Sequence, residues 1–234
     1  TSTTYMNAYE ELQTIEGLRP ANVYSVNANY LFLQKYMFSL FYERTNDYFT
    51  MDMYQAKDRL ALVYRTQNWN YYQSFGMSAN APFNIGEWLS SQVNATVVND
   101  RNRCDNFWDI PFDRKKWACM LAMQNHFSVG SNLGFDLDAM YRSSMISGIS
   151  DTKPVFTVNV GAQWNFLKNK ATLSLTCSDL FDTMRMKVRN RYAGQHIDLN
   201  MGQYSRTVSV KFVYRFGGSI SKEKKEVDSS RFGR

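Results

Sequence analysis

The sequence predicts an all-β protein, an antiparallel up-and-down transmembrane β-barrel, and three observations support this prediction. Apolar and polar residues alternate along several long segments. Aromatic residues make up 15% of the chain and gather at the ends of these segments. The segments are joined by connections that are either very short or long. Because side chains of a strand point alternately to its two faces, each strand has one apolar and one polar face, as in a membrane barrel with a wet interior.

The first strands are predicted to form a tall hairpin. Residues 24–33 suit a strand, and the alternation then resumes at Tyr36. It stays in step only if residues 36–54 and 57–82 each form one long strand. These two strands would project beyond the membrane, with the tip of their hairpin near residues 55–58.

The later strands show the clearest alternation. Between residues 133 and 142 the odd positions are apolar, whereas Asp136, Asp138 and Arg142 occupy even positions. Further strands are predicted at 156–166, 171–177 and 208–216. A soluble β-sandwich or a lipocalin-like barrel, with its apolar face inside, is the alternative interpretation of this alternation.

The overall composition agrees with a membrane barrel. The mean hydropathy is -0.45, and no segment approaches the ~20 apolar residues of a membrane-spanning helix. Barrel proteins have hydrophilic averages because only every second residue of a strand meets lipid.

The lengths of the connections predict the orientation. Short connections are expected at 34–35, 83–87, 129–132 and 167–170, and long loops at 99–116, 143–154 and 179–203. In this class of protein the short turns face the periplasm and the long loops face outside.

These connections separate about nine strands. Single-chain bacterial barrels have even strand numbers, so nine strands would form part of a larger barrel unless one strand is miscounted. We therefore expect the chain to be the C-terminal part of a longer polypeptide. Residues 1–20 would be the end of an extracellular loop, residues 21–216 the barrel strands, and residues 217–234 a polar periplasmic tail.

Two motifs near the end of the chain carry a family resemblance. Lys170–Thr183, with its alternating strand followed by Asp179-Leu180-Phe181-Asp182, resembles the penultimate strand and turn of TonB-dependent outer-membrane receptors of Bacteroidetes type. Arg206–Gly218, which contains Tyr-Arg-Phe-Gly, resembles the last strand of these receptors. Glu16–Pro20 resembles, less closely, the motif at the start of this region.

The resemblance implies a barrel of roughly 22 strands with a plugged lumen. It implies import of a large nutrient, such as a glycan, a peptide or a metal chelate, across the outer membrane of a Gram-negative bacterium. The plug domain and the contact with TonB would lie upstream, and a surface lipoprotein is a further expected partner. A non-transporting outer-membrane barrel that anchors surface partners is the alternative function.

Polar residues of the predicted strands are expected to line the lumen or to touch the plug. They are Asp136, Asp138, Arg142, Asn159, Gln163, Asn165, Lys211 and Arg215.

A basic cluster falls within one predicted external loop. Its members are Arg101, Arg103, Arg114, Lys115 and Lys116, in a chain of net charge +6. Such a loop could bind the phosphates of lipopolysaccharide or steer an anionic ligand. We do not expect nucleic-acid binding, because the aromatic residues lie on lipid-facing strands and not among these charges.

The residues give little support to enzymatic chemistry. His126 and His196 lack ligand-spaced neighbours, so no metal and no cofactor is predicted. Asp136 and Asp138 could imitate an acid–base pair, but a solvated lumen wall is the expected role. Cys104 is predicted to lie in a long loop as a free thiol.

Overall fold

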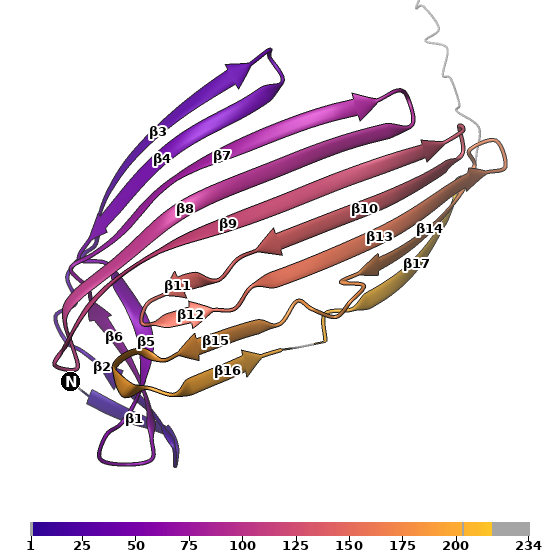
Figure 1. Ribbon diagram of the computed structural model, residues 1–234. Coiled ribbons are helices and arrows are strands. Elements are labelled where there is room, and N and C mark those ends of the chain that lie inside the picture. The colour runs from indigo at the N-terminus through magenta and orange to yellow at the C-terminus, as the bar shows by residue number, and fades with distance from the viewer. Residues whose placement is uncertain (1, 203, 217–234) are drawn as a thin grey trace, which may run out of the picture.

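The computed structural model describes residues 2–202 and 204–216, and its main feature is a curved antiparallel sheet (Figure 1). The sheet contains nine strands in the order β17-β14-β13-β10-β9-β8-β7-β4-β3. Their bounds are β3 Asn22–Phe32, β4 Tyr36–Asn46, β7 Tyr71–Ile85, β8 Leu89–Phe107, β9 Ile110–Val129, β10 Leu133–Arg142, β13 Val155–Phe166, β14 Ala171–Ser178 and β17 Thr207–Tyr214. The predicted set of nine antiparallel strands is confirmed.

The sheet does not close on itself. Neighbouring strands follow one another in chain order, and all of their pairings are antiparallel. Among the described residues, β3 pairs only with β4 and β17 only with β14. Both outer strands therefore keep one unpaired edge.

The register of the sheet places like residues side by side. Leu40 lies opposite Met77, which lies opposite Val97. The short turns fit the twist of the strands, since Leu33 and Gln34 have φ of 51° and 52°, the left-handed conformation of tight hairpin turns.

Two smaller sheets lie at the end of the molecule opposite the short turns (Figure 1). One is made of β1 Ser2–Asn7, β2 Glu10–Thr14, β6 Leu62–Asn68 and β5 Phe49–Gln55, in that order. The other is made of β11 Met145–Ser147, β12 Ser150–Thr152, β15 Met186–Asn190 and β16 Ile197–Met201, with the 3-10 helix η1 Tyr192–Gly194 between the last two. We call these two sheets and their turns the cap. In the part of the chain that the structure describes, no helix is long and apolar enough to cross a membrane.

The predicted continuous strands 36–54 and 57–82 are wrong, because each is broken where the cap begins. Asp47 has a φ of 51°, which ends β4 and turns the chain into β5. Across the hairpin, the Trp69 amide donates to the Tyr48 carbonyl at 2.6 Å, and the Asn68 side chain donates to the Asp47 carbonyl at 2.7 Å. These bonds turn the chain from the large sheet into the cap, although apolar and polar residues continue to alternate along the sequence.

The predicted connections at 143–154 and 179–203 do join strands of the large sheet, whereas the loop predicted at 99–116 is wrong. All three regions contain paired strands. β8 and β9 extend through residues 99–116 and turn at Trp108 and Asp109, whose φ values are 50° and 62°. Residues 143–154 hold β11 and β12, and residues 179–203 hold β15 and β16. Cross-strand pairing satisfies backbones whose polar sequences resemble those of loops.

The ends of the chain add two observations. Residues 1–20, expected as the end of an external loop, contain the hairpin β1–β2, and β2 pairs in parallel with β6. The predicted periplasmic tail, residues 217–234, lies outside the described residues.

The buried aromatic core lies between the cap and the ends of β8 and β9 that extend beneath it. Its residues come from β5, from the bend after β6, from β8 and β9, and from the turn after β11. They are Tyr54, Trp69, Cys104, Phe107, Phe112 and Ile149. Trp69 is fully buried and packs edge-on against Phe112, with ring centroids 4.9 Å apart. Cys104, predicted as a loop thiol, is thus a buried strand residue.

Candidate functional site: the inner wall and the cap

The two faces of the large sheet can be assigned from β8. Even-numbered residues near its start are polar, namely Ser90, Gln92, Asn94 and Thr96. Farther along the same face, Val98, Asp100, Asn102 and Cys104 are buried, and Gln67 of the cap strand β6 donates to the Cys104 Sγ at 3.5 Å. Arg103 on the opposite face is exposed. The cap therefore covers the polar face, which identifies this face as the inner wall and the apolar face as the lipid-facing one.

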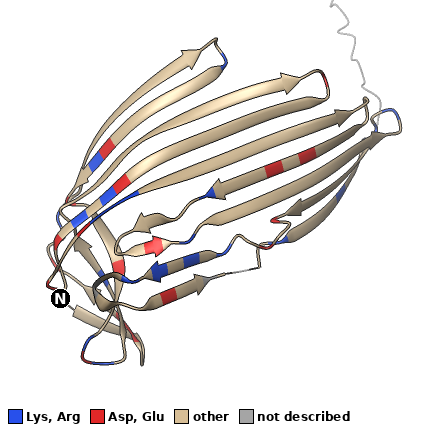
Figure 2. Cartoon of the chain, viewed as in Figure 1, with Lys and Arg blue, Asp and Glu red and all other residues tan. Residues whose placement is uncertain are grey.

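Asp136 and Asp138 lie on this inner wall in β10. Figure 2 shows the acidic part of this strand in red, in a region of the sheet with few other charges. Asp138 lies opposite Gln124 of β9 and Asn159 of β13. Asp136 lies opposite His126, and the His126 Nδ1 is 2.6 Å from the Asp136 carboxylate. Both side chains of this pair are about half exposed.

The other predicted wall residues continue the same polar surface. Gln163 lies opposite Ser174, which in turn lies opposite Lys211. The Thr172 hydroxyl donates to the Asn165 Oδ1 at 2.8 Å. The structure thus brings together the polar residues of four adjacent strands.

Two of the predicted wall residues lie at strand ends. Arg142 is the last residue of β10, and its Nε is buried with no partner among the described residues. Arg215 follows β17, and its backbone amide donates to the Lys170 carbonyl at 2.9 Å.

The Asp179–Asp182 turn folds against this wall. The Asp179 amide donates to the Asn159 side-chain oxygen at 2.8 Å. The Asp179 carboxylate accepts from the amides of Thr183, at 3.0 Å, and Met184, at 2.8 Å, and from the Ser205 hydroxyl. An aspartate at this position therefore holds the turn closed through its own side chain.

The turn and the wall enclose an open recess of about 320 Å³. Its lining combines hydrogen-bonding groups with methionines. The main residues are Gln124, Asp138, Met140, Asn159, Asp179 and Met184. Such a surface can hold a polar partner by hydrogen bonds, each worth only about 0.5–1.5 kcal/mol net, and release it again.

The predicted basic loop is corrected by the structure: its five residues lie on strands and on both faces. Arg114 and Lys116 face inward and bind Asp151 of β12 at 2.7 and 2.9 Å. Burial alone would raise the pKa of Asp151, but these two bonds hold it below its usual value. The inward pair therefore anchors the cap to β9.

The remaining three basic residues face outward. Arg101 lies opposite Lys115 and forms an ion pair with Asp113 at 2.6 Å. Arg103 forms an ion pair with Asp105 at 2.9 Å. Figure 2 shows these charges on the long strands where they approach the cap.

A second acidic group anchors the cap in another way. The Asp52 side chain is buried, and one of its oxygens accepts from the Ile149 amide at 3.4 Å while the other has no partner among the described residues. Burial raises the pKa of Asp52 to about 7, an effect that the amide bond only partly offsets. A side chain at Gly148 would collide with this carboxylate, since an added Cβ would lie 1.8 Å from its Oδ1.

Sequence reasoning missed several residues of this region. Gln124 and His126 join the inner wall, and Asp52 and Asp151 join the cap. Alternation around residues 118–129 could have placed the first two on the wall. No local pattern marks the other two, because their partners are distant in sequence. Within the described residues, no cluster of three or more histidine, cysteine or acidic side chains could hold a metal ion.

Comparison with known proteins adds the family. The Outer membrane protein beta-barrel family matches residues 3–214. The chain belongs to this family. No curated protein and no solved structure matches it.

Family membership places this outer-membrane barrel protein in the outer membrane of Gram-negative bacteria. In this family of barrels the apolar face of the sheet meets lipid and the polar face lines the interior of the barrel. The short turns and the cap then mark the two ends of the barrel.

One pair of residues departs from the lipid-facing pattern. Ser91 and Asn125 lie on the apolar face, opposite Leu137 in the register. The Ser91 hydroxyl donates to the Asn125 Oδ1 at 2.8 Å, and the Asn125 amide donates to the Leu137 carbonyl at 3.0 Å. These bonds satisfy groups that would otherwise be costly in hydrocarbon.

Proposed function

We propose that this sheet is the barrel part of a TonB-dependent outer-membrane receptor that imports a large nutrient, such as a glycan, a peptide or a metal chelate. The observation that carries the proposal is the pair of unpaired edges on β3 and β17. Each unpaired backbone group in hydrocarbon costs several kcal/mol, so both edges need partner strands in the membrane. The barrel is therefore larger than nine strands.

A large barrel requires a plug if it is not to leak. Barrels of about 22 strands enclose a lumen that is filled by a plug, whereas 16–18 strands leave an open channel. The proposed partners are accordingly a plug domain that fills the lumen and TonB, which displaces it, with a surface lipoprotein as a further partner.

The inner wall supports this function by its chemistry. Amide, hydroxyl and scattered charged groups cover it, from Gln124 to Lys211. Each contact with a plug would be modest and reversible. We propose no enzymatic role, because the His126–Asp136 pair is half exposed and lacks the desolvation that a catalytic pair requires.

The cap supports selection at the mouth. It lies over the inner wall at the external end, where it would restrict entry to the lumen. An open groove of about 450 Å³ between the β5–β6 tip and β16 carries Tyr9, Leu60, His196 and Asp198. This groove gives a large solute a first contact surface.

The test is a conductance measurement on the protein isolated from outer membranes and placed in planar bilayers. A plugged receptor should conduct little until urea loosens the plug, and then reversibly show large openings. Immobilised TonB C-terminal domain should retain the same protein preparation. Immediate large conductance without urea, or no retention by TonB, would contradict the proposal and favour a non-transporting or open barrel.

A further inference from the structure

The lipid-facing side of β4, β7, β8 and β9 changes its chemistry in successive rows toward the cap. The register aligns one residue from each strand in every row. The apolar row is Leu40, Met77, Val97 and Cys119; the interfacial row is Tyr42, Phe75, Asn99 and Trp117; the basic row is Arg44, Gln73, Arg101 and Lys115. Hydrocarbon, interface and headgroup layers follow one another in the same order in a membrane.

The spacing of the rows fits these layers. Adjacent rows are two residues apart along each strand, which corresponds to roughly 6–7 Å. The rings of Phe75 and Trp117 are exposed on this face, and amphipathic rings prefer the boundary between hydrocarbon and headgroups. The basic row therefore lies at the depth of the headgroups in the outer leaflet.

The basic row carries three cations and no acidic residue. Within the described part of the chain, no ion pair forms to Arg44 or Lys115, and Lys115 is exposed. Arg101 shares Asp113 of the next row. The row therefore keeps excess positive charge on the membrane side.

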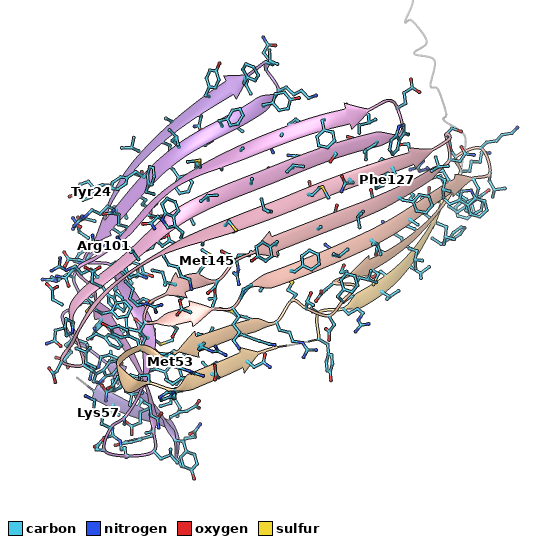
Figure 3. All side chains as sticks on the ribbon, viewed as in Figure 1. Tyr24, Met53, Lys57, Arg101, Phe127 and Met145 are labelled. Carbon is cyan, nitrogen blue, oxygen red and sulfur yellow. The ribbon has the colours of Figure 1, made fainter. Side chains whose placement is uncertain are left out.

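The two arginines are held in place by one ring. The Arg44 guanidinium lies 4.0 Å from the centroid of the Tyr71 ring, and that of Arg101 lies 5.8 Å from it. Tyr71 itself is buried. Figure 3 shows Tyr24, which lies opposite Arg44 in the register, and Arg101 on the same part of the sheet. Stacking on Tyr71 fixes the Arg44 guanidinium, and two hydrogen bonds to Asp113 fix that of Arg101. Groups that are already fixed lose less entropy when they bind a ligand.

The inner face of the sheet also carries basic residues at this level, but these are paired with an acidic residue of the cap. There Lys116 and Arg114 are matched by Asp151 of the cap. No cap element supplies such a partner to the outward row within the described residues. The outward cations are thus not required to hold the cap. Within the described residues Arg44 and Lys115 form no ion pair, whereas Arg101 and Arg103 would bind a component of the membrane in exchange for their ion pairs with Asp113 and Asp105.

We infer that the basic row (Arg44, Arg101 and Lys115), together with Arg103 in the row above, binds the phosphate groups of lipid A in the outer leaflet. Arginine binds phosphate through two parallel hydrogen bonds, and lysine adds a point charge. The acyl chains of the same lipid would pack on the interfacial and apolar rows below. The site rests on the barrel's place in the outer membrane and on the proposed orientation with the cap outside, and it is independent of transport.

The experiment measures lipid binding by native mass spectrometry of the detergent-solubilised protein. The probes are bisphosphoryl lipid A and the same lipid after enzymatic dephosphorylation. The test variant is Arg44→Gln/Arg101→Gln/Lys115→Gln. The matched control is Lys35→Gln/Lys168→Gln/Lys170→Gln, which removes the same charge at the short turns on the opposite side of the membrane.

The unmodified protein should prefer the phosphorylated lipid. The test variant should bind it about a hundredfold more weakly, given roughly 1 kcal/mol for each of its three basic residues near an anionic surface and about 1.4 kcal/mol for each tenfold change. The control should bind like the unmodified protein. Should the triple variant fail a circular-dichroism check of folding, Lys115→Gln alone replaces it.

Three results would overturn the inference. The first is equal binding of the phosphorylated and dephosphorylated lipids by the unmodified protein, which needs no variant. The second is an equal loss in the test and control variants, which would reduce the effect to net charge. The third is displacement of lipid A by low concentrations of inorganic phosphate, which would make the row a site for soluble anions.

Discussion

The large sheet and the cap are built from the same kind of element but are held together differently. In the sheet, most side chains face lipid or the lumen, and the pairings follow chain order. At the cap, side chains pack against one another around Trp69 and against Phe112 of β9. Segments that are distant in the sequence also pair there, as β2 does with β6.

The difference shows which environment determines each part. The membrane and the wet lumen impose an alternating pattern on every strand of the sheet, whatever its neighbours. The cap is surrounded by water and not by lipid, so its stability depends on its own small core and on individual buried contacts. A core substitution should therefore damage the cap, whereas a change of face should damage the sheet.

Among the substitutions considered, Trp69→Ala should cause the largest loss of stability, and this loss should be confined to the cap. The side chain is fully buried, and truncation of such a residue costs about 3–5 kcal/mol. Hydrogen exchange of residues 49–55 and 110–112 should accelerate strongly, while exchange in β10 and β13 stays slow. Trp117→Ala, which removes a 58% exposed ring on the lipid side, is the control. Equal acceleration in the sheet would show that the cap and the sheet are one cooperative unit.

Leu137→Arg should come next and should act on the sheet alone. Arginine on the lipid face near mid-membrane costs about 2–4 kcal/mol of barrel stability. Asp138→Arg, one residue away on the inner wall, should cost much less. Urea unfolding in lipid vesicles would measure both variants. The reverse order of stability would exchange the two faces assigned here.

A third prediction concerns the pH dependence of the cap. Burial raises the pKa of Asp52 from 3.8 to about 7, so the folded cap holds a proton that the unfolded segment releases. The contribution of Asp52 to cap stability is therefore fully present below about pH 3.8 and is lost as the pH rises to about 7. The protection factor of the Ile149 amide, which is the ratio of the intrinsic exchange rate to the observed rate at the same pH, should fall over this range, and Asp52→Asn should abolish that fall. An unchanged slope in the variant would assign the effect to another group.

Much of the sheet could be predicted from the sequence. The predicted strand at residues 133–142 has the observed bounds, because each of its residues obeys the rule set by lipid on one side and water on the other. The wall residues Asp136, Asp138 and Asn159 follow from the same rule and from the register. Their role as a contact surface for a plug stays a prediction.

The cap could not be predicted in this way. Arg101 and Asn102 are both polar, although they point to opposite faces of β8, so the strand shows no alternation where it leaves the membrane. The loop prediction for residues 99–116 failed for this reason. Arg44 was missed because its place in the basic row is a property of the register across four strands.

The parallel pairing of β2 with β6 also has a kinetic consequence. It joins residues as far apart as Gln13 and Arg65, 52 positions along the chain, whereas five pairings of the large sheet are simple hairpins. Contacts between distant positions form late, because the chain must first lose the entropy of a long loop. We therefore expect the hairpins to assemble first and the cap to complete the fold. A part that forms last can also open alone, so the cap can loosen while the nine strands of the large sheet keep their pairings.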